Sequence, residues 1–287
     1  MVLKERKDGW MKFLTVDEIK KLQLDILVRF ADYCEKNNLC YFLYAGTLLG
    51  AVRHKGFIPW DDDIDVIMPR PDYEKFLKMT RETPLSPDLE TRSHRTNDNY
   101  NATFIKIVDN RTQGHENHLA KEIMSGVWID VFPVDGVPNG EEAKNQFLAK
   151  MQKNIRRLEY SSRPLLFCKN PLRFAKRLAI YLGYHHFGYK KMAVEIEQEA
   201  RKYPFENSKQ AGVTVFCGGY NEVVDHSVFE ESVKLPFEGY EFNAPKQYDQ
   251  YLTTIYGDYM TLPPPEQRIS AHGYTAWWVE GYEPTEG

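Results

Sequence analysis

Apolar residues recur at helical spacing in the first well-marked segment of the chain. They lie three or four residues apart, at Ile19, Leu22, Ile26 and Phe30. Thr15 and Glu18 stand just before them at the spacing of a capping box. The pair Asn37-Asn38 follows the last apolar turn and favours a helix end. The pattern therefore predicts a helix that begins after Thr15 and ends near Asn37.

Shorter apolar runs, separated by turn residues, predict strands. They cover 39–44, 61–68, 102–108, 127–131 and 213–216, and a hairpin is expected over 233–242 with its turn at Glu238-Gly239. Further helices are expected over 48–54, 72–79, 141–160, 172–201 and 246–256. Prolines at 263–265 indicate an irregular tail. A short strand set with flanking helices predicts an α+β fold.

The composition is that of an ordinary soluble globular protein. Among 287 residues, 42% are hydrophobic and 27% charged, which excludes a disordered chain. No apolar run approaches the roughly 20 residues that span a bilayer, and the first residues lack the apolar region of a secretory signal. The four cysteines, Cys34, Cys40, Cys168 and Cys217, are not at metal-ligand spacing. We therefore expect a cytoplasmic protein with reduced thiols.

Basic residues concentrate in one predicted helical segment. Residues 150–191 hold eleven Lys and Arg and one acid, Glu159, whereas the whole chain has a net charge of −4. We predict a core over 1–140, a basic helical insertion over 141–205 and a C-terminal return over 206–287 that packs on the core. The insertion could contact an anionic membrane surface, or it could be a helical segment with a solvated basic face.

Aspartates stand in a run that otherwise has the character of a strand. Asp63 and Asp65 alternate with Ile64 and Val66, so a strand would place both carboxylates on one face. Crowded carboxylates repel one another, and oxygen ligands favour Mg²⁺ or Mn²⁺. A solvated acidic turn would explain Asp61 and Asp62 but not Asp65, which lies inside the apolar run. The run therefore predicts a site for one or two metal ions, of the kind that serves phosphoryl transfer.

Two further pieces fit this chemistry. Gly46-Thr47 lies between an apolar strand and a short helix, where a phosphate can approach the backbone, although a simple turn with a Thr cap is the alternative. Asp130 stands alone in the apolar run 128–132 and could supply a third carboxylate. Its alternative is a salt-bridged aspartate at a strand end.

These motifs resemble the LicD family. The resemblance lies in the runs 46–54 and 56–66, in Phe104-Ile105-Lys106, in 128–133 and, more weakly, in 251–259. Bacterial members are phosphocholine transferases, and animal relatives include fukutin-related ribitol-phosphate transferases. The resemblance implies a nucleotidyltransferase-like fold. It implies that Gly46 and Thr47 bind the donor phosphate, and Leu48 is also expected to bind the substrate. The cysteine-rich zinc loop of the fukutin-related branch has no equivalent here.

The resemblance also implies the reaction and its metal. Asp63, Asp65 and Asp130 are expected to bind two Mg²⁺ ions and to be catalytic, with Asp130 helping to remove a hydroxyl proton. The expected reaction moves phosphocholine from CDP-choline to a hydroxyl of a surface glycan or teichoic-acid precursor, with a lipid-linked acceptor as one form, in the cytoplasm or at the inner membrane face. Alternatives are another CDP-alcohol, such as ribitol or glycerol phosphate, and a nucleotidyltransferase that releases pyrophosphate.

Other functional classes fit less well. The three aspartates argue against a catalytically silent binding module. The basic segment lacks any motif that would favour nucleic-acid binding over charge alone, so no nucleic-acid partner is expected.

Basic and aromatic residues near these motifs complete the predicted site. Positive side chains that could neutralise phosphate charge, or lie in ordinary salt bridges, are Arg53, His54, Lys106 and Arg111. Lys106 interrupts an apolar strand, which favours a role for it. Trp60 and Trp128 adjoin the carboxylates and could bind the choline cation, or they could be ordinary core or rim residues.

Overall fold

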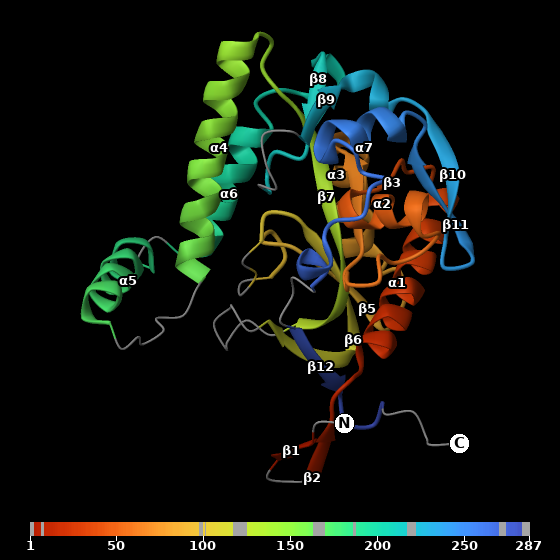
Figure 1. Ribbon diagram of the computed structural model, residues 1–287, viewed down its shortest axis with the longest axis vertical. Coiled ribbons are helices and arrows are strands. Elements are labelled where there is room, and N and C mark those ends of the chain that lie inside the picture. Colours follow the sequence, from red (N-terminus) through yellow and green to blue (C-terminus); the bar gives the residue numbers. More distant parts are fainter. Residues whose placement is uncertain are drawn as a thin grey trace.

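The computed structural model describes residues 3–6, 9–97, 100, 102–116, 125–162, 170–185, 188–216, 222–269 and 274–282. It has an α+β fold, as predicted, in which helices flank a mixed sheet (Figure 1). The main path of this sheet runs in the order β12-β6-β7-β4-β3. These strands are β3 (Phe42–Leu43), β4 (Asp65–Pro69), β6 (Ile105–Glu116), β7 (Ser125–Gly136) and β12 (Tyr274–Trp278).

Shorter strands extend or accompany the sheet. Those joined to it are β5 (Leu89–Arg92), which pairs with β6, β8 (Gln210–Gly212), which pairs with β7, and β9 (Val223–Asp225), which pairs with β8. Two separate antiparallel pairs are β1 (Leu3–Arg6) with β2 (Gly9–Lys12), and β10 (Ser232–Phe237) with β11 (Tyr240–Pro245). The predicted hairpin turn is confirmed, since Glu238 and Gly239 both have positive φ between β10 and β11.

The helices of the described segments are α1 (Val16–Lys36), α2 (Ala45–Arg53), α3 (Arg70–Glu82), α4 (Glu141–Ser162), α5 (Pro171–His185), α6 (Tyr189–Ala200) and α7 (Tyr248–Tyr256). Short 3-10 turns are η1 (Phe205–Asn207), η3 (His226–Phe229) and η4 (Pro265–Gln267). The capping box of Thr15 and Glu18 is confirmed at the start of α1. The predicted apolar face buries Ile19, Ile26 and Phe30.

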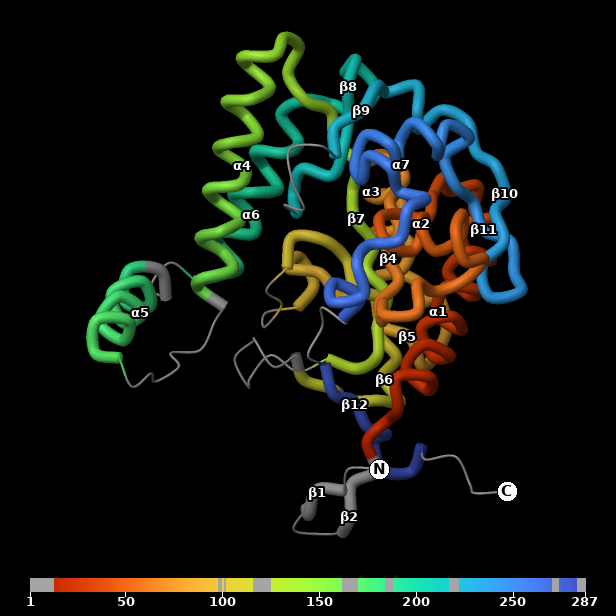
Figure 2. The backbone as a smooth tube through the Cα atoms, viewed as in Figure 1, coloured from red at the N-terminus to blue at the C-terminus, as the bar shows by residue number. Residues whose placement is uncertain are grey.

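Strand β7 is the centre of the sheet. It pairs in parallel with β4 and antiparallel with β6, and its apolar residues are buried. One continuous core includes side chains from the sheet, from α4 and α6 and from the C-terminal part of the chain. The predicted division of the chain into three parts at residues 140 and 205 stays a prediction. Figure 2 shows α4 and α6 side by side, with α5 projecting away from the sheet.

Several predicted elements differ in the structure. The single helix over 172–201 is divided, because Gly188 has φ of 63° and begins a second helix, α6. The strand over 213–216 was wrong: Val213 and Val215 are buried in the core, while β8 ends at Gly212. Strand β4 begins at Asp65 rather than near residue 61. The tail predicted as irregular includes β12, which pairs with β6.

Candidate functional site

Three charged residues lie in a row across neighbouring strands. Asp65 of β4 is the register partner of Asp130 of β7, and Asp130 is the register partner of Lys106 of β6. Register partners present their side chains on the same face of a sheet. The Lys106 Nζ atom lies 3.5 Å from Asp130 Oδ1. Thus the structure brings together two of the predicted aspartates and the predicted lysine.

The loop before β4 brings further carboxylates to this row. Ile64 and Val66 are fully buried, whereas Asp63 and Asp65 are only partly buried, so the predicted alternation is present although Asp63 precedes the strand. Loss of solvent raises the pKa of Asp65, and the charges of Asp63, Asp130 and Asp61 raise it further, while Lys106 opposes them. We call Asp61, Asp63, Asp65 and Asp130 the acidic cluster.

The acidic cluster has the chemistry of a hard-cation site. Its donors are all carboxylate oxygens, and their mutual repulsion in the ionised form is the penalty that a divalent cation removes. Across the described residues, however, no three His, Cys, Asp or Glu side chains are arranged so that they could hold a metal ion as they stand. The donor types therefore fit Mg²⁺, and the metal remains a prediction.

Gly46 and Thr47 lie beside the acidic cluster, inside the first turn of α2 rather than in a turn before it. A Cβ atom on Gly46 would lie 2.3 Å from Asp61 Oδ2, so only glycine permits this approach. Thr47 is buried, and its Oγ1 accepts a hydrogen bond of 2.9 Å from the backbone N–H of Asp65. Leu48 is fully buried and packs in the core instead of facing a substrate.

Arg53 is the last residue of α2 and His54 follows it as the C-cap, with its ring centre 6.3 Å from that of Trp60. Arg53 donates to the carbonyl oxygen of Tyr259 at 2.8 Å. Burial and the charge of Arg268 lower the pKa of Arg53, which indicates that the two guanidinium groups are close together. The Arg268 guanidinium also lies 5.6 Å from the ring centre of Trp60. Sequence reasoning missed Arg268, which stands in the tail and has no motif around it.

Arg111 is not brought to the acidic cluster. It lies five residues beyond Lys106 on β6, which is roughly 16 Å along a strand. Its guanidinium makes ion pairs with Asp25, Asp88 and Asp109. This is the salt-bridge alternative, and we leave Arg111 out of the proposed site.

Trp60 and Trp128 each lie against a cation of the protein itself. The Lys106 ammonium lies 3.7 Å from the ring centre of Trp128, and Arg268 lies over Trp60. Because each ring already faces a cation of the protein, a second cation would be repelled.

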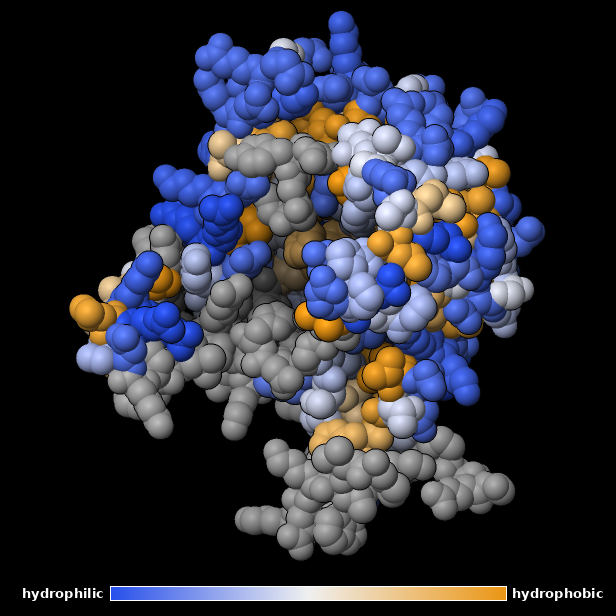
Figure 3. Space-filling view, in the orientation of Figure 1, coloured by the Kyte–Doolittle hydropathy of each residue, from blue (hydrophilic) through white to orange (hydrophobic). Residues whose placement is uncertain are grey.

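A group of tyrosines near the acidic cluster was also missed from the sequence. Tyr44 precedes α2, and its hydroxyl donates a hydrogen bond of 2.7 Å to Glu222 Oε2. Loss of solvent and the charges of Asp65 and Glu222 raise the pKa of Tyr256, which ends α7. Tyr256 belongs to the weak 251–259 resemblance, but nothing in the sequence around Glu222 indicated a role. Figure 3, in the orientation of Figure 1, shows the surface hollowed between the α4–α6 pair and the region of α7, with apolar side chains at the floor of the hollow.

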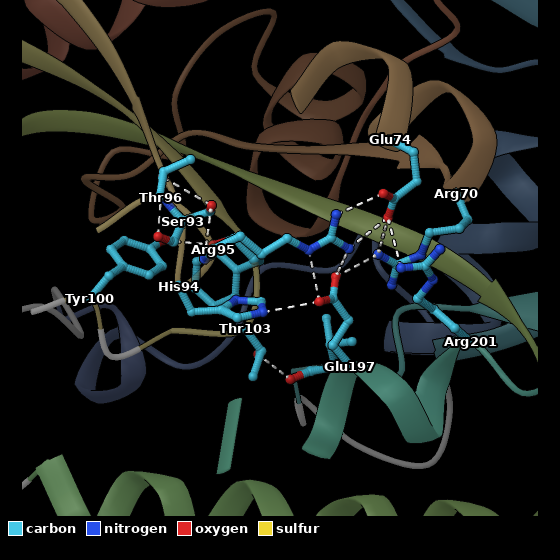
Figure 4. Close-up of polar contacts among 12 residues, drawn as sticks. Arg70, Glu74, Ser93, His94, Arg95, Thr96, Tyr100, Thr103, Glu197 and Arg201 are labelled. Carbon is cyan, nitrogen blue, oxygen red and sulfur yellow. Dashed lines mark hydrogen bonds and ion pairs between the residues drawn. The ribbon is translucent and has the colours of Figure 1, made fainter. Parts of the chain in front are cut away.

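A buried ion network holds α6 against the sheet. Figure 4 shows the charged groups of Arg70, Glu74, Arg95 and Glu197 pointing toward one another from α3, from the segment after β5 and from α6. Arg70 also binds the carboxylate of Asp135 in β7 through two nitrogens, at 2.7 and 2.5 Å. The network thereby ties the helices to the end of the strand that carries Asp130.

No helix in the described ranges is both long and apolar enough to cross a membrane.

Comparison with known proteins agrees with the resemblance to the LicD family. A family model described as LicD/FKTN/FKRP, nucleotidyltransferase domain, matches residues 38–165. The lipopolysaccharide cholinephosphotransferase LicD of Haemophilus influenzae is 37% identical over 270 residues, which cover 91% of this chain and 97% of that protein. Shorter matches are an uncharacterised protein of Rickettsia typhi, 45% identical over 60 residues (21% of this chain and 19% of that protein), and one of Rickettsia prowazekii, 64% identical over 31 residues (11% and 12%). Since the similarity to LicD extends over nearly the whole of both proteins, this chain belongs to the LicD family.

Proposed function

We propose that this phosphotransferase moves phosphocholine from CDP-choline to a hydroxyl group of a cell-surface glycan. The observation that carries the proposal is the row of Asp65, Asp130 and Lys106 in a member of the LicD family. The Haemophilus relative is named for lipopolysaccharide, so a glycan of this kind, or a teichoic-acid precursor, is the acceptor class that we propose.

The acidic cluster would provide the metal site and the proton acceptor. Asp63, Asp65 and Asp130 would hold Mg²⁺, which when bound supplies positive charge to the donor diphosphate and to the departing CMP. Asp130 accepts the proton of the acceptor hydroxyl as that oxygen attacks phosphorus. The bond from phosphorus to the CMP oxygen breaks as the new phosphodiester bond forms.

Positive side chains on both sides of the acidic cluster would neutralise donor phosphates. Lys106 lies against Asp130, and Arg53 lies near Arg268 at the end of α2. Such groups stabilise the negative charge that the transferred phosphoryl group and CMP share. Gly46 lets the Asp61 side chain approach α2, and Thr47 accepts a hydrogen bond from Asp65, the first residue of β4.

Helix α5 is the part of the chain that we propose to contact an anionic membrane, where a lipid-linked acceptor would lie. Its residues with described side chains include none that is buried, and Leu172 and Leu182 are 82% and 53% exposed. Arg173, Lys176 and Arg177 give the helix its positive charge. Exposed leucines among basic residues are typical of helices that lie on anionic lipid.

The test of the proposed reaction is product analysis with purified protein. CDP-choline, Mg²⁺ and a glycan acceptor should yield CMP and phosphocholine on the glycan, and EDTA should stop the reaction. Asp65→Asn and Asp130→Asn should each lower kcat/KM by at least about a hundredfold. Asp225→Asn, at an exposed strand end, is the matched control and should retain activity.

Other products would redirect the proposal. Release of CMP only from CDP-ribitol or CDP-glycerol would replace choline by a neutral alcohol. Release of pyrophosphate from a nucleoside triphosphate would instead identify a nucleotidyltransferase.

A further inference from the structure

Three tyrosines gather around one glutamate beside the acidic cluster. Tyr44 precedes α2, Tyr251 and Tyr256 lie on α7, and Glu222 precedes β9. The Tyr44 hydroxyl donates to Glu222 at 2.7 Å. The charge of Glu222 also acts on the hydroxyls of Tyr251 and Tyr256, as the raised pKa of each shows after the larger effect of burial. We call these four residues the tyrosine cluster.

In the described part of the chain, Glu222 has a hydrogen-bond donor but no cation beside it, and the Tyr251 hydroxyl has no partner. Glu222 is 9% exposed, and no Lys, Arg or His among the described residues lies within ion-pair distance of it. Tyr251 is fully buried, and its hydroxyl has no hydrogen-bond partner in the described ranges. Burial raises the pKa of Glu222 to about 7, although the hydrogen bond from Tyr44 lowers it. Ionised Glu222 would be a buried charge without a cation, which is costly, and a bound cation would remove that cost and keep Glu222 ionised.

The tyrosine cluster adjoins the groups proposed for phosphoryl transfer. The backbone N–H of Tyr44 donates to the carbonyl oxygen of Asp65 at 3.0 Å. The Tyr44 ring packs on Phe132, two residues beyond Asp130 on β7, with 5.5 Å between ring centres. Tyr256 is 44% exposed, and the charge of Asp65 contributes to the raised pKa of its hydroxyl. A short cationic substituent on a phosphate bound at the acidic cluster could therefore reach these side chains.

We propose that Tyr44, Tyr251, Tyr256 and Glu222 bind the trimethylammonium group of choline. A quaternary ammonium has no N–H to donate, so it is recognised by aromatic faces and by an opposite charge rather than by hydrogen bonds. The tyrosine cluster contains three aromatic rings and one carboxylate, whereas Trp60 and Trp128 already face Arg268 and Lys106. The inference rests on the proposed function, because choline comes from the donor named there.

The test compares a charged with a neutral alcohol in the full-length protein. Glu222→Gln keeps the hydrogen bond from Tyr44 but removes the charge, and Tyr256→Leu removes a partly exposed ring. Each should raise the KM for CDP-choline about tenfold and leave kcat within about twofold. The matched controls Glu230→Gln and Tyr240→Leu change exposed residues of the same types and should leave the KM unchanged.

Equilibrium binding separates this inference from the proposed function. Wild-type protein should bind phosphocholine more tightly than phosphoglycerol in ligand-observed NMR, and Glu222→Gln should reduce that preference about tenfold. If wild type releases CMP from CDP-choline but both variants keep its KM and the binding preference, the tyrosine cluster is not the choline site. If wild type does not use CDP-choline at all, the proposed function itself fails. Thermal melting of each variant checks that it is folded.

Discussion

Two glycines of α2 show how single atoms decide between fold and function. A Cβ atom at Gly50 would lie 2.4 Å from the backbone oxygen of Gly56, which cannot easily move. A Cβ atom at Gly46 would meet the end of the Asp61 side chain, which can turn away. The same substitution should therefore affect stability at one position and the acidic cluster at the other.

We predict that Gly50→Ala lowers the free energy of unfolding by about 1–3 kcal/mol, because it overpacks a contact with the backbone. Gly46→Ala should change that free energy by less than about 1 kcal/mol but lower kcat/KM by roughly 10- to 100-fold, since Asp61 must move. Urea denaturation and CMP release measure the two effects. Equal losses of stability in both variants would contradict the distinction.

At the scale of elements, the buried ion network makes the attachment of α6 sensitive to acid. Burial alone would raise the pKa of Glu197, but hydrogen bonds from His94 and Arg95 and their charges lower it to about 2. Because the folded state holds this carboxyl below its ordinary pKa, the contribution to stability is complete above about pH 4.5. It is lost as the pH falls toward 2.

Glu197→Gln should therefore lower the free energy of unfolding by about 3 kcal/mol at pH 7, because it leaves buried arginine charge without its partner. The difference between wild type and variant should shrink between about pH 4.5 and pH 2. Chemical denaturation at several pH values measures it, with the exposed Glu195→Gln of the same helix as control. A difference that does not depend on pH would show that the charge of Glu197 is unimportant.

The exposed helix α5 gives a second prediction at this scale. The protein should sediment with vesicles that contain anionic lipid at low salt, and high salt should release it. Replacing Arg173, Lys176 and Arg177 by Ser should weaken binding at least about tenfold, since each basic group near such a surface contributes about 1 kcal/mol. Binding to neutral vesicles should be weak.

The control for this experiment removes three exposed positive charges from another helix. Lys75, Lys78 and Arg81 of α3 are all exposed. If their replacement by Ser weakens binding as much as the α5 variant does, the contact follows from overall charge and not from α5. Absence of wild-type binding at low salt would reject the membrane contact.

For the molecule as a whole, the features that could be predicted from the sequence are those that depend on a local pattern of residues. The capping box of α1 and the turn at Glu238-Gly239 depend on neighbouring residues, and both were confirmed. The aspartates were predicted because Asp65 and Asp130 break apolar runs, and β4 and β7 place them side by side. The LicD family was recognised from the same runs and is confirmed by the relatives.

What escaped prediction depends on distant partners. Tyr44 and Glu222 are 178 positions apart, so no local pattern could join them. Arg111 looked like a phosphate ligand until its ion pairs with Asp25 and Asp88 were known. Strand β12 could not be distinguished from an irregular tail without its partner, because only the ladder with β6 makes it a strand.

The pairing of β12 with β6 has a consequence for how the protein is made. Synthesis proceeds from the N-terminus, so β6 leaves the ribosome long before Tyr274–Trp278 exists to cover the positions 112–116 of its edge. Until then this stretch presents unpaired backbone groups, which other chains can add to. Any product that stops before Tyr274 keeps that edge open permanently, and aggregation is then its expected fate.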